Sequence, residues 1–110
     1  MENSNYGLTD FQLSDMLYSK LIICDLRKKE DFSKGHIKKS VLVKFDEKNL
    51  IDVPPDSKIV LVGYDDIQSK KIMFVLRRNN IDAYYLIDGI KGWHLGLYCT
   101  NISYVGTGYP

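Results

Sequence analysis

Short, continuous apolar runs recur along the chain, and polar or amphipathic segments separate them. The runs lie at 21–25, 41–43, 59–62 and 83–87. A strand that is buried on both faces has this pattern, because neither of its faces meets water. Each run therefore predicts a strand, and the run at 59–62, which has four aliphatic residues and no polar break, is the most strand-like of them.

Amphipathic segments fill the intervals between these runs. Thr9 and Gln12 have the spacing of a capping box, in which two side chains bond each other's backbone, and they predict the start of a helix. The helices that we expect lie at about 10–18, 28–34 and 68–79, with a short one ending near 93. Strands that alternate with helices favour parallel pairing and helices on both faces of the sheet.

The length of the chain sets its domain organisation. With 110 residues, 45% of them hydrophobic and 26% charged, the chain is long enough for one compact domain and too short for two. We expect a single domain over 1–110, with its core at about 8–96 and a tail or the start of a linker at 97–110. The proline-containing stretch 45–57 predicts a connection with a helical turn near 47–51.

Charge, targeting signals and cysteines exclude several function classes. Fifteen basic and fourteen acidic residues give a formal charge of +1, which does not favour nucleic acid or an anionic membrane as a partner. No apolar run approaches the ~18–20 residues of a membrane span, and the polar N-terminus lacks the pattern of a signal peptide. The two cysteines, Cys24 and Cys99, have neither disulfide-framework nor metal-ligand spacing. We therefore expect a cytoplasmic protein with no metal and no cofactor.

Three segments carry motifs in a fixed order. The first segment contains Asp25-x-Arg27, Glu30 and the turn Gly35-His36-Ile37. The second is the strand at 59–62 with the loop after it and Ser69. The third is Asp88-Gly89-Ile90, which leads to Trp93. Together they resemble the rhodanese family over about residues 8–96. The resemblance implies the α/β rhodanese-like fold, a central parallel sheet of about five strands with helices on both faces.

The resemblance also identifies the loop that carries the family's chemistry. Active members have a six-residue loop, Cys-x-x-Gly-x-Arg, in which the cysteine takes sulfane sulfur from a donor such as thiosulfate and passes it on as a persulfide. Aligned on the strand and on Ser69, the loop of this chain reads Gly63, Tyr64, Asp65, Asp66, Ile67 and Gln68. Gly63 then stands at the cysteine position, Asp66 at the glycine position and Gln68 at the arginine position.

Each of these replacements opposes sulfur transfer. Gly63 supplies no nucleophile, and Gln68 supplies no cation for thiosulfate or phosphate. Asp65 and Asp66 bring negative charge to a place that attracts anions, or they satisfy the N-terminus of the following helix. We therefore expect a member without catalytic residues, whose altered loop forms a binding surface. Its expected contact residues are Tyr64, Asp65, Asp66, Gln68 and Ser69.

The remaining motif residues have structural interpretations. We expect Arg27 to form an ion pair with Glu30 or Asp31 at the strand-to-helix corner, and Asp25 to accept hydrogen bonds from loop backbone. Trp93 is expected to anchor the last helix in the core.

We expect structural or surface roles for several other side chains. Cys24 lies inside an apolar run and is expected to be inert. His36 belongs to a turn that the family uses structurally. Tyr64 and the pair Tyr84–Tyr85 are expected to contribute to an exposed aromatic surface, with Tyr64 touching a partner.

Two classes of function remain open. The first is a non-catalytic rhodanese-like module that acts in protein interaction or regulation through the surface around 63–68. The second is a sulfurtransferase-related enzyme whose thiol is Cys99 or comes from a partner domain. A further alternative is that Asp65 and Asp66 bind a cation or a small cationic ligand.

Overall fold

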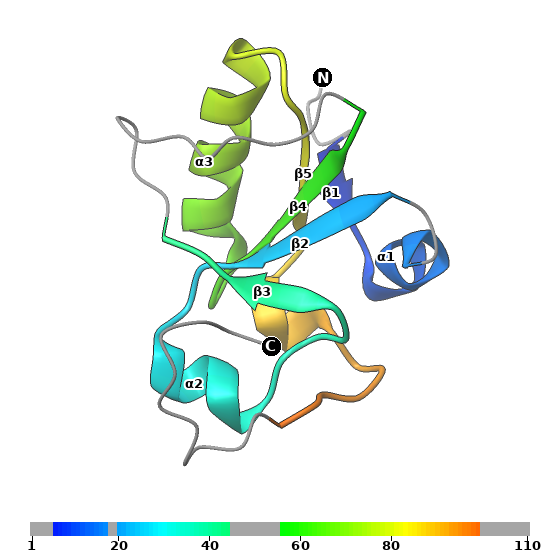
Figure 1. The fold of residues 1–110 in the computed structure, drawn as a ribbon, viewed down its shortest axis with the longest axis vertical. Helices are drawn as coiled ribbons and strands as arrows, with labels where there is room; N and C mark the ends of the chain where they lie inside the picture. The colour runs from blue at the N-terminus through cyan, green and yellow to red at the C-terminus, as the bar shows by residue number, and fades with distance from the viewer. Residues whose placement is uncertain (1–5, 18–19, 45–55, 100–110) are drawn as a thin grey trace.

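Parallel strands with helical crossovers build the part of the chain that the computed structural model describes, residues 6–17, 20–44 and 56–99 (Figure 1). The elements in chain order are β1 (Gly7–Leu8), α1 (Asp10–Met16), β2 (Leu21–Asp25), α2 (Lys29–Lys34), β3 (Ser40–Leu42), β4 (Lys58–Val62), α3 (Asp66–Arg78), β5 (Asp82–Leu86) and the 3-10 helix η2 (Gly89–Gly92). The predicted α/β class is confirmed.

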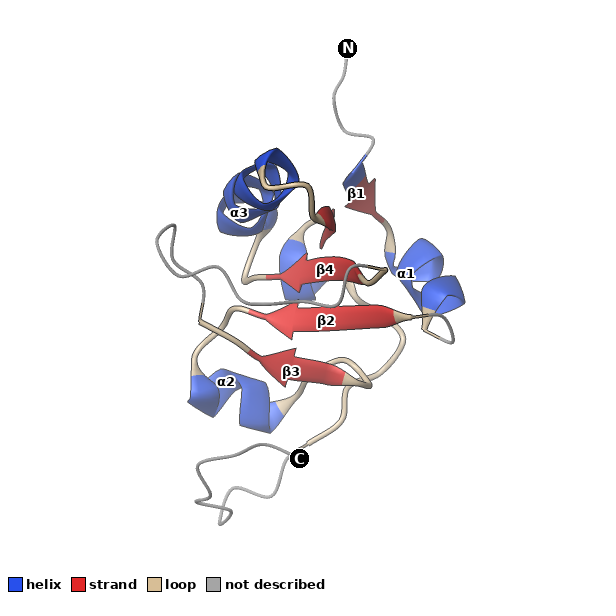
Figure 2. Ribbon diagram, turned by 45° about the horizontal axis from the view of Figure 1, so that its top comes forward, coloured by secondary structure: helices blue, strands red, loops and turns tan. Residues whose placement is uncertain are grey.

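The sheet has five strands in the order β1-β5-β4-β2-β3, and all neighbouring strands are parallel. The arrows of β2, β3 and β4 run side by side in one direction in Figure 2. The last residues of β2 and β4, Asp25 and Val62, are paired in the ladder. The loop that follows β4 therefore emerges directly beside Asp25, at the carboxyl edge where open α/β sheets place their ligands.

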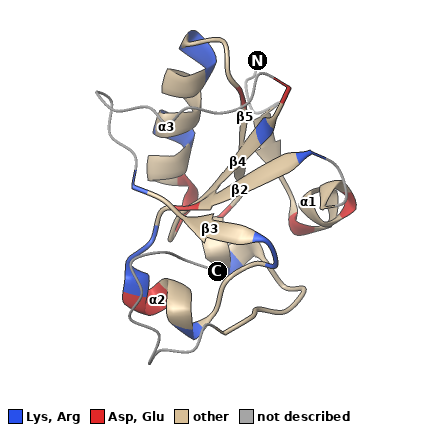
Figure 3. Cartoon of the chain, viewed as in Figure 1, with Lys and Arg blue, Asp and Glu red and all other residues tan. Residues whose placement is uncertain are grey.

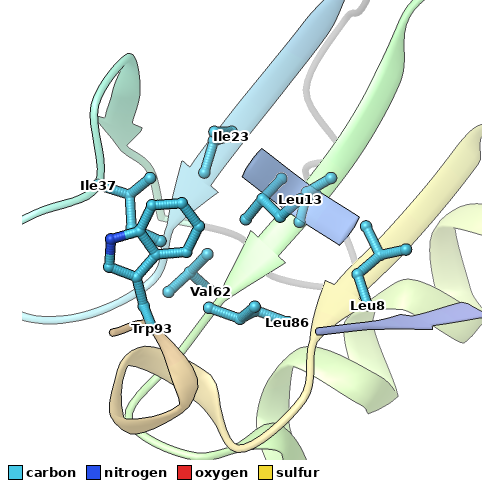
Figure 4. Close-up of a cluster of buried hydrophobic side chains, with 8 residues drawn as sticks. Leu8, Leu13, Ile23, Ile37, Val62, Leu86 and Trp93 are labelled. Atoms are coloured by element: carbon cyan, nitrogen blue, oxygen red, sulfur yellow. The ribbon is translucent and has the colours of Figure 1, made fainter. Parts of the chain in front are cut away.

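Two apolar clusters cover the two faces of the sheet. One contains Leu13 of α1 and Trp93, which lies just after η2 (Figure 4), and the other contains Met73 and Leu76 of α3. Alternate residues of β4 serve opposite clusters, as the period of two in a strand requires, with Val60 in the first and Leu61 in the second. The expectations of helices on both faces and of Trp93 as a core anchor are confirmed.

The helix starts agree with the sequence patterns and show one shift. Thr9 and Gln12 form the complete capping box at the start of α1. Helix α3 begins at Asp66, two residues before the predicted start, because the side chain of Asp65 caps it by accepting a hydrogen bond from the amide of Ile67. In the described ranges, no helix has the length and apolar character needed to cross a membrane.

Two sequence expectations need correction or lie outside the structure. Tyr85 is only 3% exposed, because its side chain packs in the apolar cluster with Met73 and Leu76 of α3, so the prediction of an exposed Tyr84–Tyr85 pair is wrong for Tyr85. Strand β1 was not predicted, since two residues are too few to show a period. The helical turn expected near 47–51 falls outside the described residues.

Candidate functional site

The loop between β4 and α3 rests on the segment that begins η2. The carbonyl oxygen of Gly63 accepts a hydrogen bond from the amide of Ile90 at 2.8 Å. Gly89 has a φ of +63°, and a Cβ atom on it would lie 2.5 Å from the same carbonyl oxygen. Only glycine allows this close approach in the left-handed region. The motif that contains Gly89 and Ile90 therefore packs against the loop and holds its first residue in place.

Gly63 itself is buried, and its φ does not require glycine. Its φ lies outside the left-handed region, and a Cβ atom would meet the carbonyl oxygen of Asp65 at 3.0 Å and the Oγ atom of Ser69 at 3.9 Å. A shift of a few tenths of an ångström at Asp65 would relieve the first of these contacts. A side chain at position 63 would therefore point over the loop towards Ser69. Because residue 63 is glycine, the loop has no side-chain functional group at this place.

The two carboxylates of the loop bond backbone amides. Asp65 caps α3 with a hydrogen bond of 2.9 Å from the amide of Ile67, and Asp66 accepts a hydrogen bond of 3.3 Å from the amide of Asp88. The interpretation of Asp65 as a helix cap is confirmed. Negative side chains thus occupy the N-terminus of α3, where the helix dipole would otherwise favour an anion.

The other two loop residues expected at the binding surface differ in accessibility. Ser69 is fully buried, and its hydroxyl donates to the carbonyl oxygen of Asp65 at 3.4 Å. Gln68 is exposed, and its side chain forms no hydrogen bond with any residue in the described ranges. Gln68 is therefore accessible to a partner, whereas Ser69 serves the internal structure of the loop.

An open pocket of about 340 Å³ lies beside the loop, lined by Asp65, Asp88, Lys91, Gly92 and His94. Two carboxylates oppose one lysine there, so the lining does not favour a divalent anion such as thiosulfate. Among the described residues, no three His, Cys, Asp or Glu side chains are grouped so that they could hold a metal ion.

His94 at the rim of this pocket is held by Asp10 at the start of α1. The Nδ1 atom of His94 lies 3.1 Å from Oδ2 of Asp10, and the amide of His94 lies 3.3 Å from the same oxygen. Burial acts to raise the pKa of Asp10, but the hydrogen bonds from His94 and from the amide of Phe11 outweigh it and lower the pKa below its usual value. The contact joins α1 to the segment after η2.

Tyr64 joins the loop to α2. Its hydroxyl donates to the carboxylate of Asp31 and accepts from the amide of Lys28 at 3.2 Å. The hydrogen bond to Asp31 raises the pKa of Tyr64, because it stabilises the protonated phenol. The ring remains 44% exposed. Tyr64 therefore presents a surface whose orientation is fixed from the neighbouring helix.

The ion pair at the strand-to-helix corner differs from the expected one. Arg27 binds Asp25, with Nε at 3.0 Å from Oδ1 and Nη2 at 2.9 Å from Oδ2, and the prediction of Glu30 or Asp31 as its partner is wrong. Asp25 is fully buried and requires a cation and hydrogen bonds, which Arg27 supplies from two positions away. The amide of Arg27 also donates to Asp25, as expected of loop backbone.

Gly35 and His36 complete this corner. Arg27 donates a second hydrogen bond from Nη2 to the carbonyl oxygen of Gly35 at 2.6 Å. The ring of His36 stacks on Phe32 with 4.1 Å between centroids, and the backbones of His36 and Tyr98 exchange two hydrogen bonds. These contacts join α2 to the carboxyl-terminal segment and assign His36 a structural place.

Neither cysteine is placed near the loop as an activated thiol. Cys24 is buried in β2, and burial together with the charge of Asp25 raises its pKa to about 12. Cys99 is exposed, and its Sγ atom donates to the carbonyl oxygen of Lys34 at the end of α2.

Comparison with known proteins assigns the family. The family model described as "Rhodanese-like domain" matches residues 11–95. This chain belongs to the rhodanese-like domain family. A search of curated proteins found no match.

Solved structures show the same fold. A rhodanese-like domain protein from Staphylococcus aureus is 27% identical, with a TM-score of 0.73 over 86% of this chain and 98% of that one. The BH2092 protein from Bacillus halodurans is 19% identical, with a TM-score of 0.67 over 80% and 70% of the two chains. A rhodanese-related protein from Thermoplasma volcanium is 15% identical, with a TM-score of 0.67 over 79% and 88%.

Several contacts of the site had no signal in the sequence. The sequence indicates Asp31 only as a partner for Arg27, whereas its bond to Tyr64 spans 33 positions. Asp10 and His94 lie 84 positions apart. Asp88 was visible only as the residue before Gly89, and its φ of 65° is a conformation that Asp tolerates in tight turns.

Proposed function

We propose that this rhodanese-like domain is a non-catalytic cytoplasmic module that acts in protein interaction or regulation. The observation that carries the proposal is Gly63, which follows β4 directly, at the place where the family resemblance puts the sulfur-carrying cysteine. The φ of Gly63 lies outside the left-handed region, so backbone conformation alone does not require glycine here. A glycine at this position supplies no nucleophile for sulfur transfer.

The charges around the loop support the same proposal. Sulfur donors such as thiosulfate are anions, and a site for them needs cations or free backbone amides. Here Asp65 and Asp66 bond amides at the N-terminus of α3 and of the turn before η2. Gln68 takes the position of the family's arginine and carries no charge. Electrostatic repulsion therefore acts against the usual substrates.

The accessible part of the loop fits a surface for a macromolecular partner. Tyr64 is 44% exposed and Ile67 is 69% exposed. A rigidly held tyrosine supplies contact area at low cost in conformational entropy, which is why tyrosine is frequent at the centres of interfaces. The bond from Tyr64 to Asp31 fixes this side chain before a partner arrives.

The competing function is sulfur transfer through Cys99 or a thiol supplied by a partner. Cys99 is exposed, but its thiol donates to the carbonyl oxygen of Lys34 and does not lie on the loop. The test is a thiosulfate-to-cyanide assay on the purified chain and on its Cys99→Ser variant. We expect no thiocyanate above the buffer rate from either protein. Turnover by the wild type that the Cys99→Ser change abolishes would contradict the proposal.

A further inference from the structure

The side of α3 that turns away from the sheet carries exposed apolar residues between basic ones. Its residues follow one another at spacings of four, three and four positions, so they lie along one line of the helix. We call this line the outer α3 face, and it consists of Ile67, Lys71, Phe74 and Arg78. Ile67 is 69% exposed and Phe74 is 44% exposed. The opposite side of the helix, with Ser69, Met73 and Leu76, is buried on the sheet.

Basic charge is concentrated on this helix. Helix α3 has four basic residues and one acidic residue, whereas the whole chain has a formal charge of only +1. Figure 3 shows basic segments in the middle and at the carboxyl end of α3 and an acidic one only at its start. The local field of α3 is therefore positive along most of its length, although the protein as a whole is nearly neutral.

Two of the four basic side chains are engaged within the domain, and two are not. Arg77 donates to the carbonyl oxygen of Ala83 and pairs with Asp82, and Lys70 lies over the ring of Tyr85. Lys71 and Arg78 are exposed and form no ion pair with any residue that the structure describes. They lie on the same line as Ile67 and Phe74. Their charges are thus available to an outside group.

We propose that the outer α3 face docks an amphipathic helix of a partner protein, whose apolar stripe is bordered by aspartate and glutamate. This inference rests on the proposed function and names the partner chemistry for the same surface, because Ile67 belongs to both the altered loop and α3. Carboxylates complement Lys71 and Arg78, and burial of Ile67 and Phe74 against the partner removes apolar surface from water, which favours binding.

The shape of the face favours a helix as its occupant. Helix α3 has 13 residues, so it presents a convex surface about 20 Å long. A convex helix surface packs best against another helix, whose side-chain ridges enter its grooves. A contact of one helix on another is small for a protein interface, so we expect a reversible complex.

A displayed peptide library tests both the chemistry and the place. The probe is a set of helical peptides of about 15 residues, long enough to match α3, with leucine fixed along one face and all residues allowed at the bordering positions. We expect selection on the wild-type protein to enrich Asp and Glu at the borders. The Lys71→Glu/Arg78→Glu variant is expected to bind the selected peptide at least about tenfold more weakly.

Matched controls show whether binding depends on the outer α3 face or only on the net charge of the protein. Lys29→Glu/Lys38→Glu makes the same change in net charge at exposed positions of α2 and the turn after it, and its affinity is expected to stay within about twofold. Ile67→Ala removes an exposed apolar side chain without changing charge and is expected to weaken binding. Circular dichroism with thermal unfolding checks that each variant is folded.

Three outcomes would overturn the inference. They are no enrichment, enrichment of neutral or basic borders, and equal loss of binding in the control pair and in the Lys71→Glu/Arg78→Glu pair. If the selected peptides lose binding to the Tyr64→Ala variant but not to the Lys71→Glu/Arg78→Glu variant, the inference is contradicted and the proposed function still stands. Sulfur transfer by the wild type would contradict the proposed function itself, whatever the library yields.

Discussion

Gly89 lies so close to Gly63 that a Cβ atom on Gly89 would stand 2.5 Å from the Gly63 carbonyl oxygen. The amide of Ile90 donates to the same oxygen. The segment after β5 therefore fixes the loop after β4, and two motifs that are distant in sequence form one structural unit.

The Gly89→Ala change is expected to destabilise the domain by about 2–4 kcal/mol, since it adds the strain of a left-handed alanine to a backbone clash. Gly96→Ala is the matched control, because Gly96 also has a positive φ, +96°, but open space around its Cβ position. Its expected cost is about 1–2 kcal/mol. Urea denaturation measures both, and equal costs would show that the contact with Gly63 has no energetic weight.

The buried pair of Asp25 and Arg27 is expected to make the corner before α2 sensitive to the loss of either partner. Arg27→Met leaves the buried carboxylate of Asp25 without its cation, and we expect a loss of about 3–5 kcal/mol in the free energy of unfolding. Glu30→Gln, at an exposed position of the same corner, is expected to stay within about 0.5 kcal/mol. If Glu30→Gln lowers the free energy of unfolding much more than Arg27→Met does, the ion pair between Arg27 and Glu30 that the sequence predicts would be supported instead.

The lowered pKa of Asp10 predicts a dependence of stability on pH. A carboxyl group whose pKa is lower in the folded state stabilises the fold above its unfolded value, near 3.8, and loses this contribution as the pH falls through the folded value. Asp10→Asn is therefore expected to unfold more easily than the wild type near neutral pH, and the difference is expected to shrink in acid.

Asp15→Asn is the control for this experiment, since Asp15 is an exposed carboxylate on the same helix. Urea denaturation curves of the three proteins, recorded from acid to neutral pH, measure the effect. A gap between Asp10→Asn and the wild type that stays constant with pH would mean that Asp10 contributes only through its contacts with His94 and Phe11 as a hydrogen-bond acceptor, without its charge.

Rebuilding the loop is expected to require several substitutions. Gly63→Cys alone supplies a thiol at a position with room for a side chain, but no cation to hold the sulfur donor. The triple variant Gly63→Cys/Asp66→Gly/Gln68→Arg restores the pattern of active family members and is expected to form thiocyanate at least about tenfold faster than the single variant. Equal rates would mean that the missing thiol is the only obstacle.

The fold was predictable from the sequence where periodic patterns are long. The strand at 59–62 and the helix near 68–79 were found within two residues of their ends, because buried strands and amphipathic helices leave distinct patterns. Strand β1 was missed, since a two-residue edge strand is defined by its partner β5 and not by its own side chains.

The altered loop was predictable and most of its contacts were not. Its position follows from the motifs around it, whereas the choice of Asp25 over Glu30 or Asp31 by Arg27 depends on burial, which local sequence does not give. The bond from Tyr64 to Asp31 depends on how α2 packs beside the loop. Tertiary packing decides such pairings, and a single sequence carries little information about them.

The most direct test of the central claim is the intact mass of the purified chain after incubation with thiosulfate. We predict no added sulfur atom on the wild type, because no cysteine stands on the loop and Cys24 is buried. The triple loop variant serves as the positive control. A persulfide on the wild type, located at Cys99 by peptide mapping and passed to cyanide, would contradict the account and make the domain a sulfurtransferase with a relocated thiol.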